Sequence, residues 1–268
     1  MKFGVIGCGH MAGIILEQMI KNGTVKKEDV RVSVKHAYRR TELREKLDVT
    51  VCEDNVSVAS GADVLLVGIK PQDFEKVMGE IRGCLREDTI LLSIAVGISI
   101  EKICSYIGRE VKVIRLMPNL PAQVGEGCCG YCPARIVTED ECERAVGMFR
   151  PFSIPVKVHE EDMDIVSSIA SAGVAFVYIL IEALADGAVA EGLKRDLAYQ
   201  FASQMVLGAG KLVRDSDVHP GALKDAVCSP GGTTIEGVSI LEEKGFRSAV
   251  IEATRTCVKK SRFLSGEQ

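Results

Sequence analysis

The chain has 268 residues, a formal net charge of −4 and a hydrophobic fraction of 47%, so it can bury the core of one large domain or of two smaller ones. The acidic balance and the lack of a long basic run argue against a nucleic-acid partner. Ten cysteines without a secretory signal favour a reducing compartment over a disulfide framework, and we therefore expect a cytoplasmic protein.

The first residues predict a nucleotide-binding turn. A short apolar strand over residues 2–6 is followed by a helix that ends at Asn22 and Gly23. Between them, Gly7, Gly9 and Ala12 form a G-x-G-x-x-A pattern in the strand–turn–helix context that dinucleotide-binding Rossmann folds require. The first glycine makes the turn, the second lets a pyrophosphate approach the backbone, and Ala12 lets the helix pack closely against the strand.

The end of the second predicted strand, residues 30–34, indicates which cofactor is bound. Enzymes that use NAD usually carry an acidic residue at this point to hold the ribose hydroxyl. Here the chain has Lys35, His36, Arg39 and Arg40. Basic groups suit a 2′-phosphate, so we predict NADPH, with NADH as a weaker alternative. The competing interpretation is the solvated basic start of a helix.

Further strands are predicted over residues 49–51, 63–68, 89–94 and 111–116, and edge strands over 128–131 and 153–158 flank a helix over 139–149. The parallel strands end at Gly68, Val96 and Asn119, and Lys70-Pro71 follows the first of these ends. In open α/β sheets the carboxyl ends of the strands face one ligand-binding crevice. We therefore expect these residues to lie near the cofactor.

After residue 159 the pattern changes to helices alone, over 162–187, 194–214 and 246–263 with two shorter helices between them. This predicts a Rossmann domain over 1–159 and an all-helical domain over 160–268. The uncharged run Ile165–Ile181 has almost the length of a membrane span, but serines interrupt it and Glu182 ends it. We predict a fully buried core helix at a subunit interface and no membrane partner.

A glycine-rich turn precedes the helix that carries Ile235. Ser229-Pro230-Gly231-Gly232 can only form a turn, and Thr233 stands three residues before Glu236, which predicts a capping box. Backbone amides then converge at a helix N-terminus, where an anion such as a small carboxylate is favoured. The alternative is an ordinary turn that caps an ordinary helix.

Two further patterns predict no site. Cys129 and Cys132 form a lone C-x-x-C after Cys128, with no second pair of ligands nearby, so buried thiols and no metal site are expected. Glu182 and Asp186 share one helix face, where a polar edge is favoured over an acid/base pair.

The second half of the chain resembles the pyrroline-5-carboxylate reductase family. The resemblance rests on His219–Asp225, on Ser229–Thr234 and on Glu182–Gly187, with the Gly7–Ala12 turn and Lys70-Pro71 in the first half. It implies an α/β fold in which an N-terminal Rossmann domain precedes an all-helical dimerisation domain, and helices that interleave in a homodimer or a higher multiple of dimers. It also implies reduction of 1-pyrroline-5-carboxylate, a cyclic imine carboxylate, to L-proline by NADPH.

The resemblance also implies roles for individual residues. Thr234 matches the family threonine whose hydroxyl meets the ring nitrogen, which makes it the catalytic candidate, and Asp217 matches an acidic position near the substrate. The partner subunit lends the turn that binds the carboxylate. The predicted substrate-binding residues are Asp217, Ser229, Gly231, Gly232, Thr233 and Thr234. The predicted cofactor-binding residues are Ile6, Gly7, Cys8, Gly9, His10, Met11, Lys35, Arg39, Asn55, Gly68, Lys70, Pro71, Val96 and Asn119.

Two positions depart from the family pattern. The family usually reads Gly-Ser-Gly-Pro-Ala-Tyr where this chain reads Ser171–Phe176 after Ala170, and Ala226 replaces a common asparagine. Two other functions therefore stay open at this point: reduction of another cyclic imine acid, and a non-catalytic NADP-binding sensor. The intact Ser229–Thr234 turn argues against the sensor, which needs no carboxylate site.

Overall fold

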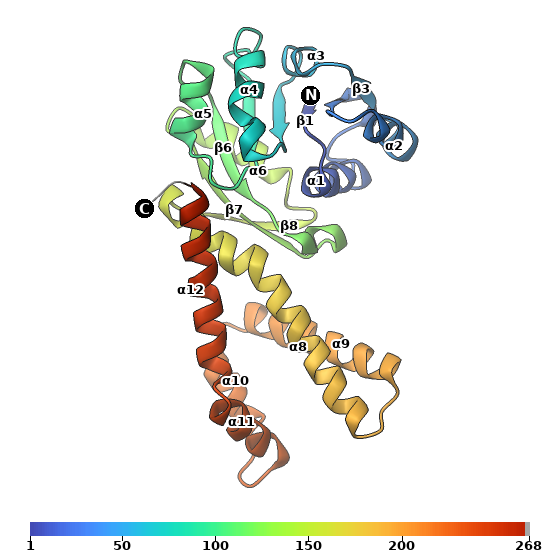
Figure 1. Cartoon of the computed structure of the whole chain (residues 1–268), viewed down its shortest axis with the longest axis vertical. Coiled ribbons are helices and arrows are strands. Elements are labelled where there is room, and N and C mark those ends of the chain that lie inside the picture. The colour runs from blue at the N-terminus through green and yellow to red at the C-terminus, as the bar shows by residue number, and fades with distance from the viewer. Residues whose placement is uncertain (266–268) are drawn as a thin grey trace. The chain divides into compact units, whose positions relative to one another are not determined.

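The structure, a computed structural model, describes residues 1–265 and divides into two compact units (Figure 1). Unit 1 comprises Met1–Ser171 together with the C-terminal stretch from Val258, and unit 2 comprises Ala172–Cys257. Unit 1 is the α/β part and unit 2 is helical. A functional boundary after residue 159 stays a prediction.

The described part of unit 1 contains an eight-stranded sheet in the order β3-β2-β1-β4-β5-β6-β7-β8. The six strands from β3 to β6 in this order are parallel, β7 runs antiparallel to β6, and β8 runs parallel to β7. This order confirms the predicted Rossmann fold. The strands are β1 Phe3–Ile6, β2 Val30–Ser33, β3 Thr50–Cys52, β4 Val64–Val67, β5 Ile90–Ser93, β6 Val113–Met117, β7 Gly127–Pro133 and β8 Ser153–Lys157.

Helices cover both faces of this sheet. Because successive side chains of a strand point to opposite faces, Val64 and Leu66 of β4 join one core cluster, whereas Leu65 and Val67 join the other. The α-helices of unit 1 are α1 His10–Lys21, α2 Ala37–Leu47, α3 Asn55–Ala59, α4 Pro71–Ile81, α5 Ile100–Ile107, α6 Glu139–Gly147 and α7 Met163–Val166. Short 3₁₀ helices occupy Lys27–Asp29, Leu120–Val124 and Glu160–Asp162.

The helical part begins with a change of helix type. A π-helical turn at Ser167–Ala172 separates α7 from α8, which starts at Gly173. The remaining helices are α8 Gly173–Ala190, α9 Arg195–Asp215, α10 Pro220–Ala226, α11 Thr233–Glu243 and α12 Phe246–Ser265. The last turns of α12 belong to unit 1, where the Ser261 hydroxyl donates a hydrogen bond to the Asp164 carboxylate.

The predicted burial of the Ile165–Ile181 run is wrong for one chain. Ile169 and Ile179 are more than 60% exposed, and Tyr178 is half exposed. Among the described residues, one continuous helical stretch, Glu160–Ala190, is long and apolar enough to span a membrane by length and composition, and 6% of its most apolar window is buried. The run is therefore largely exposed in one chain, and its burial at a subunit interface stays a prediction.

Candidate active site

The turn after β1 forms a tight backbone cradle. Gly7 has φ of +79°, and a Cβ there would clash with the side chain of Ile69. Gly9 precedes α1 and has open space around its Cα, since the nearest non-neighbouring atom to an added Cβ is the Gly68 carbonyl oxygen at 4.0 Å. The N-terminus of α1 has no side-chain cap and no acidic residue in its first turn. The cradle therefore fits the pyrophosphate of a dinucleotide.

The end of β4 explains why Ala12 occupies the third position of the pattern. A Cβ on Gly68 would lie 2.6 Å from the Ala12 Cβ and 2.6 Å from the Gly7 carbonyl oxygen. The loops after β1 and β4 thus touch through backbone atoms and one methyl group. Larger residues at any of these three positions would push α1 away from the sheet.

Basic side chains meet the cradle from the loop after β2 and from α2. The Arg39 guanidinium donates to the Cys8 carbonyl oxygen at 3.0 Å and pairs with Glu42 at 2.5 Å. Arg40 instead donates to the carbonyl oxygens of Val34 and Glu53. Lys35 is 76% exposed and lies 3.7 Å from Asp73. Arg39 therefore places positive charge beside the cradle, whereas the Lys35 ammonium lies near Asp73 of α4 and Arg40 holds the loop after β2 through backbone carbonyl groups.

A polar chain supports Asn55 at the start of α3. The buried Ser33 hydroxyl donates to Asn55 Oδ1 at 2.7 Å, and Asn55 Nδ2 donates to the Glu80 carboxylate at 2.6 Å. Asn55 is half buried at the edge that the cradle occupies. No sequence pattern marks Ser33 or Glu80, because their hydrogen bonds to Asn55 depend on strand order and on the packing of α3 against α4.

The other predicted cofactor residues follow the remaining strand ends. Lys70 and Pro71 stand at the N-terminus of α4, and Lys70 is exposed. Val96 after β5 is 39% exposed. Asn119 after β6 is buried, and its amide bonds the Cys128 backbone N–H at 2.9 Å and the Ala170 carbonyl oxygen at 2.9 Å. Its side chain is thus engaged with the protein itself.

Two thiols, Cys8 near the cradle and Cys129 in β7, are buried, whereas Cys128 and Cys132 of β7 are partly buried. Burial raises the pKa of Cys8 to about 11 and that of Cys129 to about 12. In β7, Cys129 and Cys132 are three residues apart and so point to opposite faces of the strand. Within residues 1–265 no group of three or more potential ligands gathers to hold a metal ion.

In unit 2, the predicted glycine-rich turn is present but differs in its cap. The Gly232 N–H donates to the Ser229 carbonyl oxygen at 3.0 Å, and Gly231 has φ of +65°. A Cβ on Gly232 would clash with the Ser229 hydroxyl and lie 3.1 Å from the Ser229 carbonyl oxygen, so a larger residue here would displace the Ser229 side chain. Gly232 is the N-cap of α11, and Thr233 is its first helical residue.

The predicted capping box between Thr233 and Glu236 is therefore wrong. The helix begins one residue earlier than the pattern suggested, with Gly232 at the N-cap, so Thr233 is the first helical residue and its hydroxyl caps nothing. The consequence is a helix N-terminus without a side-chain cap, at which exposed Thr233 and Thr234 present their amides and hydroxyls. Such an end favours an anion from outside the chain.

Asp217 and His219 lie in the connection from α9 to α10. Asp217 is exposed and adopts a left-handed conformation with φ of +52°, which is uncommon for a residue other than glycine. His219 is the N-cap of α10, and its Nδ1 accepts the Gly221 N–H at 3.0 Å. The backbone therefore holds Asp217 in a specific conformation in the connection that leads to the turn.

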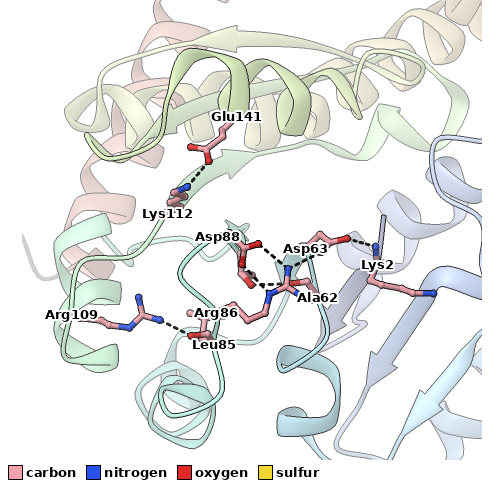
Figure 2. A network of polar contacts seen from close by, with 10 residues as sticks. Lys2, Ala62, Asp63, Leu85, Arg86, Asp88, Arg109, Lys112 and Glu141 are labelled. Carbon is pink, nitrogen blue, oxygen red and sulfur yellow. Dashed lines mark hydrogen bonds and ion pairs between the residues drawn. The ribbon is translucent and has the colours of Figure 1, made fainter.

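A cavity of about 390 Å³ lies at the other edge of the sheet. Its lining includes Val64 and Ile90, the first residues of β4 and β5, together with Asp63, Asp88 and Glu141. Figure 2 shows that these carboxylates are paired: Arg86 bonds Asp63 and Asp88, and Lys112 bonds Glu141. The cavity is at the amino ends of the strands, away from the cradle.

Comparison with known proteins gives two family matches. Residues 160–264 match the domain described as pyrroline-5-carboxylate reductase dimerisation, and residues 2–97 match the domain described as NADP oxidoreductase, coenzyme F420-dependent. The pyrroline-5-carboxylate reductase of Escherichia coli K12 is 40% identical over 264 residues, with 98% of each chain covered. That of Arabidopsis thaliana is 37% identical, with 98% of this chain and 95% of the relative covered.

Solved structures give the same match for the whole chain. The pyrroline carboxylate reductase of Plasmodium falciparum with NADP bound has a TM-score of 0.89, 30% identity and 98% coverage of both chains. The pyrroline-5-carboxylate reductase of Coxiella burnetii has a TM-score of 0.90, 28% identity and the same coverage.

Proposed function

Because this chain belongs to the pyrroline-5-carboxylate reductase family, it reduces 1-pyrroline-5-carboxylate to L-proline with NADPH, and we propose that its Ser229–Thr234 turn holds the carboxylate of that substrate. The observation that carries this proposal is the uncapped N-terminus of α11 behind Gly231 and Gly232. The amides there have no intrahelical acceptor, and the helix dipole adds to the attraction for a negative charge.

The Thr234 hydroxyl orients the ring nitrogen of the substrate. Thr234 is the second residue of α11, so its side chain projects from the same turn of helix whose amides hold the carboxylate. In a cyclic imine acid the nitrogen is one carbon away from the carboxylate, which is within reach of a neighbouring hydroxyl. Asp217 supplies negative charge near the protonated imine, and this charge favours the electrophilic form.

The cofactor lies on the cradle formed by Gly7, Gly9 and the N-terminus of α1. When bound, NADPH supplies the hydride that the imine carbon accepts. The chain's own residues orient it: the amides of the α1 N-terminus hold the pyrophosphate, and Arg39 with Lys35 binds the 2′-phosphate through charge-assisted hydrogen bonds. The other predicted residues at the strand ends, apart from Asn119, surround the nicotinamide and the riboses.

The working enzyme is a homodimer or a multiple of dimers, in which the partner subunit lends the carboxylate-binding turn. The exposed apolar surface of α8 and the match of residues 160–264 to a dimerisation domain support this proposal. We assign residues 1–159 to cofactor binding and 160–268 to dimerisation and substrate binding. All ten cysteines are free thiols, which supports a cytoplasmic location.

A steady-state assay tests the proposed use of the turn. The purified protein is mixed with NADPH and pyrroline-5-carboxylate, and loss of NADPH absorbance is followed with and without competing proline or a cyclic carboxylate that lacks the imine. We expect competitive inhibition by the carboxylate in the wild type. Replacing Gly232 by alanine, which clashes with the Ser229 hydroxyl, should raise KM for the substrate and weaken this inhibition, while KM for NADPH stays unchanged.

A further inference from the structure

The segment that connects the sheet to α8 is fastened to unit 1 at several points. Glu160 Oε1 accepts the Ile100 backbone N–H at 2.8 Å and the Arg115 guanidinium at 2.6 Å. The Arg115 side chain is buried, whereas the Glu160 side chain is 35% exposed, so the ion pair is partly shielded from solvent. Further along, a Cβ on Gly130 would lie 2.7 Å from Val166 Cγ1, so α7 packs directly on the backbone of β7. The segment from Glu160 to Val166 is therefore held in place by contacts within unit 1.

The π-helical turn at Ser167–Ala172 needs support from outside the helix. A π turn shifts the hydrogen-bond register and leaves backbone carbonyl groups short of a donor. Asn119 Nδ2 donates to the Ala170 carbonyl oxygen at 2.9 Å, and the Ser171 hydroxyl donates to the Pro118 carbonyl oxygen at 3.3 Å. Two adjacent residues after β6 thus bond two adjacent residues of the π turn.

The amide of Asn119 is fully oriented by these contacts. Its Oδ1 accepts the Cys128 N–H at 2.9 Å, and Nδ2 faces the Ala170 carbonyl oxygen and, at 3.2 Å, the Cys128 sulfur. An amide nitrogen has two hydrogens, and both have partners inside the protein. Asn119 is buried at 6% exposure, so it has no donor left for a ligand, although it stands at the cofactor edge of the sheet.

We propose that Asn119 is a positioning residue, which fixes the start of the helix that carries the dimerisation domain to the cofactor edge of the sheet and does not itself bind NADPH. This revises the predicted role of Asn119 and rests on the reduction and cofactor placement proposed above. The Ser171 hydroxyl contributes to the same attachment through its hydrogen bond to the Pro118 carbonyl oxygen. Hydride transfer depends strongly on small displacements, so loosening this contact lowers turnover and leaves cofactor binding intact.

The test uses the full-length enzyme and a near-isosteric change. Asn119→Asp keeps an acceptor for the Cys128 N–H, but an ionised carboxylate cannot donate to Ala170. We expect kcat to fall about tenfold, the size of one lost buried hydrogen bond, while the Kd for NADPH, measured by fluorescence titration, stays within about twofold. Amide hydrogen exchange over residues 167–172 should accelerate in the absence of cofactor.

A second variant and a matched control keep the test decisive if Asn119→Asp does not fold. Ser171→Ala removes the bond to Pro118 and should shift kcat and exchange in the same direction by a smaller factor. Ser168→Ala makes the same change in the same turn, but that hydroxyl bonds the Asp164 carbonyl oxygen one turn earlier in the helix, so both readouts should stay at the wild-type level.

Two results would overturn the proposal. One is a rise in the NADPH Kd that accounts for the whole loss of activity while exchange at 167–172 is unchanged, which would make Asn119 a cofactor ligand. The other is wild-type turnover and exchange in the folded variants. Failure of the wild-type enzyme to reduce the substrate would count against the proposed function instead, because the exchange measurement needs no substrate.

Discussion

Thr234 places a hydroxyl on the first turn of α11 beside amides that no side chain caps. A hydrogen bond to a charged or charging group is worth about 1.5–3 kcal/mol, which corresponds to roughly a ten- to hundredfold change in rate. We predict that Thr234→Ala lowers kcat/KM for pyrroline-5-carboxylate by this factor with little change in NADPH affinity, and that Thr234→Ser keeps most activity. A loss within about twofold in folded, dimeric Thr234→Ala protein would remove the residue from the mechanism.

The preference for NADPH over NADH depends on residues at the end of β2. Arg39 already contacts the Cys8 carbonyl oxygen of the cradle, and Lys35 is exposed. Replacing both by alanine should raise KM for NADPH and leave KM for NADH nearly unchanged, since only the 2′-phosphate loses its partners. Steady-state kinetics with each cofactor measures this. The control is Lys46→Ala, because Lys46 lies on α2 like Arg39 but pairs with Glu17. Equal KM values for NADPH and NADH in the wild type would contradict the proposed binding of the 2′-phosphate.

At the scale of elements, the strands and the glycine positions were predictable because local rules determine them. Gly7 was predicted as the turn-making glycine of the G-x-G-x-x-A pattern and has φ of +79°, and Gly231 was predicted within the Ser229–Gly232 turn and has φ of +65°. The cap of α11 was mispredicted by one residue, because the hydrogen bond that closes the Ser229 turn places Gly232 at the N-cap. The π turn and the Asn119 contacts could not be predicted, because they join residues 51 positions apart.

The amino edge of the sheet carries an ion-pair network that ties β4 to the segment before β5. The Asp63 carboxylate accepts hydrogen bonds from Arg86 and from the Lys2 backbone N–H, and these bonds lower its pKa. The Arg86 side chain likewise lowers the pKa of Asp88. Figure 2 shows the arrangement. Because the folded pKa values lie below the unfolded value of about 3.9, their contribution to stability is present above that pH and is lost as the pH falls through the folded values.

We therefore predict that the Asp63 and Asp88 carboxylates change the melting temperature little between pH 7 and pH 5. Below about pH 4 their protonation should lower the melting temperature. Arg86→Gln should lower the melting temperature at neutral pH, and it should make the further fall of the melting temperature below about pH 4 smaller than in the wild type. Differential scanning calorimetry measures both effects. Arg150→Gln, which disrupts an exposed pair with Glu143 on another part of unit 1, is the control. An unchanged acid decline in Arg86→Gln would show that other carboxylates determine it.

At the scale of the whole molecule, unit 2 lacks a core of its own in one chain. The hydrophobic side chains that it buries are the three small residues Ala185, Ala198 and Ala202, while Phe201, Leu207 and Ile179 are more than half exposed. Surfaces of this kind normally mark an interface. The apolar run was evident from the sequence, and its place at a subunit interface stays a prediction; its exposure among the described residues of one chain could not be read from the sequence.

We predict an obligate homodimer that buries more than the ~1,600 Å² of a standard interface. Sedimentation velocity at micromolar concentration should show no monomer, and the melting temperature should rise with protein concentration, because assembly stabilises the folded state by mass action. Replacing the exposed Ile179 by lysine should weaken the dimer, whereas lysine in place of the exposed Val124 in unit 1 should not. A monodisperse and active monomer would refute this prediction.

The return of α12 to unit 1 has a consequence for the order in which the protein is made. The Ser261 hydroxyl reaches the Asp164 carboxylate, and the stretch from Val258 belongs with the nucleotide-binding part. Ribosomes add about 5–20 residues per second, so the sheet emerges several seconds before the last helix that completes its unit. Unit 1 is thus completed only after all of unit 2 has been synthesised, and a nonsense codon anywhere in the helical half leaves unit 1 unfinished.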